Sequence, residues 1–174
     1  MSVKKAWREF TKNLAACIGA LDDDEYLIIA RADANQYVQF AGMGVCGIRS
    51  EATGNGFIEP PELLLDERQY ARMRGFGWMR PTALPGEPTD GGSPNFHVDG
   101  ANSEKGRREL AKRATRTFRR VYGVKHPDVL NYEAFHCEGA SIRFPTLLIK
   151  RRVPEPMFLG NDMSMDDHNS LDQL

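Results

Sequence analysis

The stretch YLIIARADANQYVQFAGMGVCGIRSE, residues 26–51, decides the fold of this chain. Residues 26–31 are rich in aromatic and β-branched side chains, and a polar turn follows them. Residues 36–41 alternate apolar and polar side chains, which is typical of a strand with one buried face. Residues 45–51 alternate again after a glycine-containing turn. Because short connections suit antiparallel neighbours, the stretch predicts a three-stranded meander with one apolar face.

Amphipathic helices are expected on both sides of this meander. Residues 3–21 repeat apolar side chains at three- and four-residue steps, and residues 103–122 do the same with Leu110, Ala114, Phe118 and Val121. A shorter helix is expected over 63–74, with Asp66 and Gln69 as its capping box. The apolar helix faces then cover the apolar face of the sheet.

Adding short strands at 77–79 and 95–98 gives the order α-β-β-β-α-β-β-α, followed by a C-terminal extension. Within that extension, residues 129–135 and 142–149 are apolar runs that suit either a strand or a short helix. The predicted class is α+β, a two-layer sandwich in which helices pack on an antiparallel sheet. Residues 1–153 form one domain, and 154–174 form a polar, acidic and mobile tail.

Composition excludes several function classes. Hydrophobic residues make up 41% and the formal net charge is −1, so no global charge demands nucleic acid or an anionic membrane as partner. No apolar run approaches the roughly 18 residues of a membrane helix. Three widely spaced cysteines argue against a disulfide framework, and we expect a cytoplasmic protein.

The sequence lacks a recognisable catalytic or metal-binding motif. Residues 42–47 match G-x-G-x-x-G, but a strand and a loop follow them where a dinucleotide site needs a helix, so hairpin glycines are expected. The four histidines do not pair at ligand spacing. We therefore expect no enzyme, no cofactor and no metal. A cysteine–histidine pair assembled in space, with His97 or His136 beside Cys137, remains an alternative.

The helix at 103–122 carries a basic surface opposite its apolar face. Its cations are Arg108, Lys112, Arg113, Arg116, Arg119 and Arg120. One interpretation is a solvated face; another is a surface for an anionic partner. Nucleic acid is a possible partner, although no aromatic residue interleaves with the cations and no helix-turn-helix precedes them. An acidic protein segment fits as well, including residues 161–174 of the chain itself.

The second face of the meander is a candidate peptide-binding surface. The alternation directs Tyr37, Gln39, Arg49 and Glu51 away from the helix-covered side. An aromatic ring and paired polar groups on an open antiparallel face suit a polypeptide ligand. Arg49 and Glu51 could instead form a solvated ion pair, and residues 142–149 could cover the face.

The order of elements resembles the type III secretion chaperone fold and the related YbjN-like proteins, including peptide-binding chaperone domains of the TY-Chap type. The stretches that carry the resemblance cover roughly residues 7–135 and are Tyr37-Val38-Gln39-Phe40, Arg49-Ser50-Glu51, Gly77-Trp78, Asn95-Phe96 and Tyr122-Gly123-Val124 ahead of Pro127. The resemblance implies a non-enzymatic chaperone or adaptor that binds a peptide or partner protein, with a link to secretion and a tendency to form homodimers.

Overall fold

A six-stranded sheet covered by helices on one face forms the molecule, which a computed structural model describes over residues 2–83 and 92–152. The strands are arranged in the order β4-β3-β2-β1-β5-β6. All neighbouring pairs are antiparallel except β5 and β6, which are parallel. The strands are β1 (Glu25–Arg31), β2 (Tyr37–Gly42), β3 (Ile48–Ala52), β4 (Phe96–Gly100), β5 (Leu130–His136) and β6 (Lys150–Arg151).

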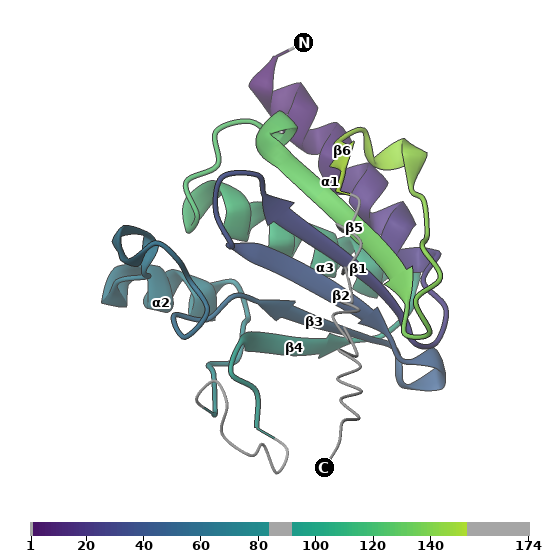
Figure 1. Cartoon of the computed structure of the whole chain (residues 1–174), viewed down its shortest axis with the longest axis horizontal. Helices are drawn as coiled ribbons and strands as arrows, with labels where there is room; N and C mark the ends of the chain where they lie inside the picture. The colour runs from purple at the N-terminus through teal and green to yellow at the C-terminus, as the bar shows by residue number, and fades with distance from the viewer. Residues whose placement is uncertain (1, 84–91, 153–174) are drawn as a thin grey trace, which may run out of the picture.

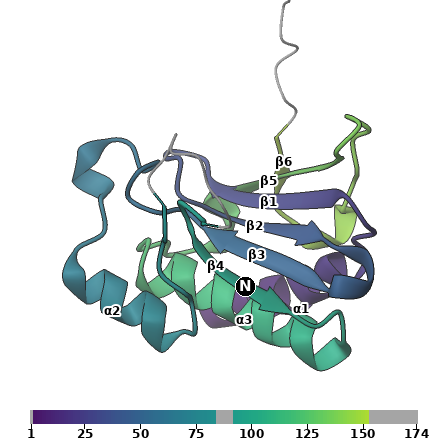
Figure 2. The same cartoon turned by 90° about the horizontal axis from the view of Figure 1, so that it is seen from below.

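Two long helices, α1 (Val3–Gly19) and α3 (Glu104–Arg120), form the second layer. They pack against each other and lie behind the sheet in Figure 1, and Figure 2 shows the two layers from the side. Their apolar faces close the core between helices and sheet, because alternate strand residues point to that side. The largest fully buried side chains include Leu14, Ile18, Phe118, Leu27, Ile29, Phe40, Ile48 and Phe96.

Local signals explain where the helices begin. The Ser2 and Ser103 side chains accept hydrogen bonds from the first-turn amides of α1 and α3. The short helix α2 (Glu67–Gly75) begins with a capping box, as predicted, in which Asp66 and Gln69 each accept from the other's backbone amide. None of the helices in the described part of the chain is long and apolar enough to cross a bilayer.

The predicted α+β class, with helices packed on a sheet, is confirmed. Residues 77–79 contribute only a single bridge, Met79 to His97, instead of a strand. The run at 142–149 does not cover the open face: it contains a 3₁₀ turn, Pro145–Leu147, that packs beside α1 with Leu147 buried. The expected tail at 154–174 lies outside the described residues, so the domain boundary stays a prediction.

The G-x-G-x-x-G stretch is a turn between β2 and β3. Gly44 and Gly47 have φ angles of 51° and 98°, in the left-handed region that favours glycine. A Cβ at Gly42 would lie 1.8 Å from the carbonyl oxygen of Asp22, so this position requires glycine for a different reason, close backbone approach. The strand predicted over residues 45–51 starts only at Ile48, and Cys46 is exposed in the turn before it.

Gly42→Ala should therefore lower the free energy of unfolding by about 1–3 kcal/mol, because the added methyl group overlaps a neighbouring main chain that can only move by disturbing the β1 start. Denaturant unfolding measures this change. Gly75→Ala is the matched control: its Cβ meets nothing within 4 Å, so it should be neutral or slightly stabilising. Equal effects of the two substitutions would contradict the close approach at Gly42.

Candidate functional site

No helix of the described chain covers the sheet face opposite α1 and α3 (Figures 1 and 2). Strand register aligns Glu133, Ile28, Gln39, Glu51 and His97 across five neighbouring strands. Their alternating partners on the same strands are the buried core residues, which fixes the direction in which this row points. The uncovered face is thus continuous from β5 to β4.

The Glu51 carboxylate is the centre of a polar network on this face. It accepts hydrogen bonds from Gln39 at 3.0 Å and Arg49 at 3.0 Å, and longer ones from Asn95 and Ser93 at 3.3 and 3.4 Å. The Glu51 side chain is 16% exposed, so its bonds to ionised and amide donors are partly shielded from water. Glu51 is held in one orientation by groups from β2, β3 and the segment before β4.

Two further contacts extend the network to its margins. Arg49 also contacts Asp99 of β4, with 3.3 Å between Nη1 and Oδ1. Asn95 donates a hydrogen bond of 3.1 Å to the hydroxyl of Tyr37. Burial, together with the nearby Glu51 carboxylate, raises the pKa of Tyr37 despite the hydrogen bond from Asn95. The Tyr37 hydroxyl therefore stays protonated at neutral pH and retains a proton to donate.

Away from the Glu51 network the face is mainly apolar, although Glu133 of β5 lies opposite Ile28. The rings of Tyr26 and Phe135 stack with centroids 5.4 Å apart and an interplanar angle of 18°. Ile28, Ala30 and Ala41 lie on the same face of β1 and β2 and are half-buried although no helix packs on them. An aromatic pair beside small aliphatic side chains offers a flat apolar surface of the kind that contacts a ligand.

The four residues expected on this face, Tyr37, Gln39, Arg49 and Glu51, are placed together as the alternation predicts. Sequence reasoning missed Asn95, Ser93 and Asp99, which complete the network. Asn95 lies 44 positions from Glu51, and only the pairing of β4 with β3 brings the two together. The Tyr26–Phe135 stack was missed for the same reason, because the pairing of β1 with β5 joins distant segments.

The basic side of α3 is less open than the sequence suggests. Arg108 pairs with Glu104 at 2.6 Å, and Lys112 pairs with Glu109 at 2.8 Å. Arg113 does not lie on the solvent face as expected: it is half-buried, donates to the carbonyl of Phe76 at 2.8 Å, and lies over the ring of Trp78. Arg116, Arg119 and Arg120 are exposed.

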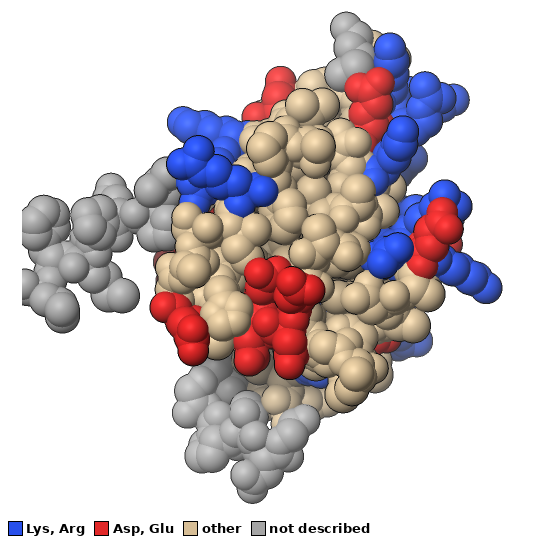
Figure 3. All heavy atoms as spheres, turned by 90° about the vertical axis from the view of Figure 1, so that its right-hand side faces the viewer, with Lys and Arg blue, Asp and Glu red and all other residues tan. Residues whose placement is uncertain are grey.

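Aromatic rings do accompany two of these cations, although other parts of the chain supply them. The Arg119 guanidinium lies 5.7 Å from the ring centroid of Trp7 in α1, and Arg113 lies 5.7 Å from that of Trp78. Both indoles are buried. Figure 3 shows Lys and Arg side chains along the right-hand margin of this view, with some acidic side chains among them, and in a second cluster at the upper left; the largest acidic patch lies below that cluster.

No group of three or more metal-ligating side chains converges within residues 2–83 and 92–152, and His168 lies beyond them. Cys137 has its sulfur 3.8 Å from Nδ1 of His136. Desolvation, with the negative charges of Asp24 and Glu138, raises the pKa of this thiol. A raised pKa disfavours the thiolate that a nucleophilic cysteine requires.

Comparison with family models matches residues 1–136 to TY-Chap3, described as the T3SS (YopN, CesT) and YbjN peptide-binding chaperone 3 family. No curated protein and no solved structure matched the chain. The matched segment runs from α1 into β5 and so contains both the Glu51 network and the Tyr26–Phe135 stack. On this match, the chain belongs to the TY-Chap3 family of peptide-binding chaperone domains.

Proposed function

We propose that this chain is a non-enzymatic chaperone or adaptor that holds a segment of a client polypeptide on the uncovered face of its sheet. One observation supports this most directly: on that single face, an apolar half lies beside a polar half whose side chains are held in fixed orientations. Membership of a peptide-binding chaperone family supports the same assignment.

The apolar half supplies affinity without selecting one sequence. An apolar client side chain laid over the Tyr26–Phe135 stack and Ile28 removes surface from water on both partners, which contributes about 25 cal/mol per Å². The strands already hold these side chains, so little conformational entropy is lost on their side of the contact.

The polar half sets the orientation of the client segment on the sheet. Because Asn95 donates to the Tyr37 hydroxyl, the phenol proton points elsewhere and can be donated to a client carbonyl. The Glu51 carboxylate fixes Gln39 and Arg49 by 3.0 Å hydrogen bonds, so their remaining donors are presented in fixed positions. A client backbone crossing these strands would meet donors at one end and aromatic surface at the other.

We propose further that this chain acts in the cytoplasm on proteins destined for secretion, and that it works as a homodimer. Analytical ultracentrifugation at several protein concentrations tests the homodimer. A single monomeric species at roughly 100 µM, a concentration at which even a weak dimer is populated, would contradict it.

Peptides selected from a random library on the immobilised chain provide ligands for a direct test. Ile28→Asp should weaken their binding by at least about tenfold, because it places a charge in the middle of the apolar half. Fluorescence anisotropy measures the affinities, and thermal unfolding verifies the fold. The matched control is Arg68→Glu, an exposed charge change on α2. Unchanged affinity in a folded Ile28→Asp protein would remove the sheet face from the proposal.

The environment of Tyr37 predicts a pH effect. Since the folded state raises the pKa of Tyr37, its neutral form contributes stability below the unfolded value of about 10, and this is lost as pH rises through the folded value. Wild-type protein should therefore lose more stability than Tyr37→Phe between about pH 9 and pH 11.5. Denaturant unfolding at these pH values measures the difference. Parallel losses in both proteins would show that the phenol is not held in its neutral form.

A further inference from the structure

A groove runs along the outer side of the helix layer, between α1 and α3. Three adjoining hollows of about 520, 320 and 310 Å³ form it. The first and second share Arg8 and Thr11, and the second and third share Lys12 and Ala15, so the hollows are continuous. The groove follows the 17 residues of α1, which corresponds to a length of about 25 Å.

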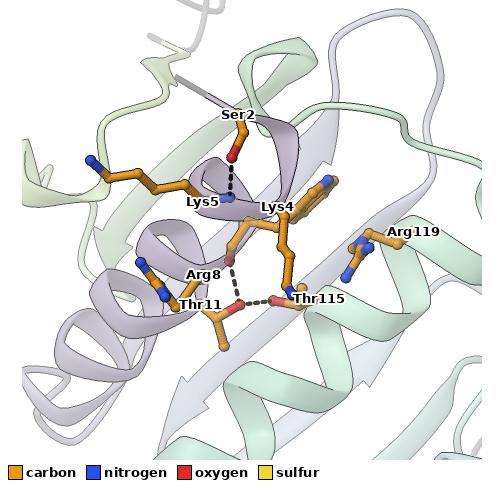
Figure 4. Close-up of a pocket in the computed structure, with 8 residues that line it drawn as sticks. Ser2, Lys4, Lys5, Arg8, Thr11, Thr115 and Arg119 are labelled. Carbon is orange, nitrogen blue, oxygen red and sulfur yellow. Dashed lines mark hydrogen bonds between the residues drawn. The ribbon is translucent and has the colours of Figure 1, made fainter.

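The walls of the groove are strongly basic. Eight Lys or Arg side chains and one acidic side chain, that of Glu104, line the three hollows. Within the described residues, no ion pair forms at Lys4, Arg8 or Lys12 of α1, or at Arg119 of α3. In Figure 4, Lys4 and Arg119 reach over the floor from opposite helices, whereas Lys5 points away and pairs with Glu9.

The floor of the groove offers few polar groups to a ligand. Thr11 donates to the carbonyl of Trp7 and accepts a hydrogen bond of 2.9 Å from Thr115 across the two helices, so neither hydroxyl proton is free for a ligand (Figure 4). Further along, the floor is made by Ala15 and Ala16, and the Arg107 side chain packs over Gly19. A ligand in this groove is held by charges at the rims and by apolar contact at the floor.

An acidic polypeptide fits this arrangement better than a nucleic acid. Small floor residues accept apolar side chains, which a nucleic acid lacks. Single-stranded nucleic acid binds largely by stacking on exposed aromatic rings, and the ring at this groove, Trp7, is 2% exposed and lies under Arg119. Carboxylates spaced along one face of a peptide can meet the cations of both walls.

We propose that the α1–α3 groove is a second binding surface, which takes an acidic amphipathic segment of a partner protein, with its carboxylates toward Arg8, Lys12 and Arg119 and its apolar side chains on the alanine floor. This surface lies on the opposite side of the molecule from the uncovered sheet face. The proposal therefore does not depend on the sheet site, and either can fail alone.

The probe is a fluorescein-labelled 18-residue peptide with Glu on one helical face and Leu and Ala on the other. It should bind the full chain in an anisotropy titration, with affinity that falls as salt rises. Arg8→Glu/Lys12→Glu should weaken binding by at least about tenfold, because two attractive charges become repulsive. Both side chains are exposed, so the variant should fold as the wild type does.

Arg68→Glu/Arg74→Glu on α2 is the matched control, since it changes the net charge equally at exposed positions away from the groove. It should bind the probe as wild type does, and so should Ile28→Asp. Equal loss in the α2 control would reduce the effect to overall charge and overturn the proposal.

Two further measurements test whether the groove binds something other than a partner protein. The first uses an oligonucleotide with the same charge as the peptide. If it binds the wild type more tightly than the peptide does, and does not bind Arg8→Glu/Lys12→Glu, the groove is a nucleic-acid site. Residues 161–174 carry four aspartates and no Lys or Arg. If the probe binds only after these residues are deleted, the chain's own acidic segment competes for the groove and the assignment to a partner is wrong.

Discussion

The packing of two helices on a single face of the sheet is the constraint on which the rest of the structure depends. Strand side chains alternate, and only one set, which includes Leu27, Ile29, Phe40 and Ile48, is apolar enough to bury against α1 and α3. The other set is mixed, so it does not attract a covering layer from the described chain. One-sided packing leaves two surfaces: the uncovered sheet face, and the groove between α1 and α3 on the far side.

The Glu51 network depends on how β4 returns to the sheet. β3 and β4 are separated in the chain by α2 and the segment after it, yet their pairing brings Asn95 and Asp99 beside Glu51 and Arg49. The intervening segment is itself anchored, because Trp78 donates a hydrogen bond to Thr117 and Arg113 donates to Phe76. The position of the polar half of the sheet face is therefore tied to α3.

Local patterns in the sequence predict much of this fold. Alternation in residues 36–41 and 45–51 places Tyr37, Gln39, Arg49 and Glu51 on one face, and helical periodicity places Leu14 and Phe118 in the core. Pairing between distant segments is not visible in such patterns. Such contacts between distant segments bring Asn95 to Glu51 and Phe135 to Tyr26, and they bring Arg113 to the carbonyl of Phe76. The glycines of residues 42–47 predict a turn at this place. The start of β3 at Ile48 depends on hydrogen bonds that composition does not specify.

The edges of the sheet have a consequence for self-association. An exposed edge strand presents unpaired main-chain groups on which another chain can add a strand and aggregate. At one edge, β6 is two residues long and consists of Lys150 and Arg151. At the other edge, Met79 bridges to His97 through two main-chain hydrogen bonds and occupies part of β4. With both edges shortened or partly capped, lateral growth of the sheet is disfavoured, and a polypeptide that approaches this domain meets side chains on the sheet face more readily than free backbone at its rim.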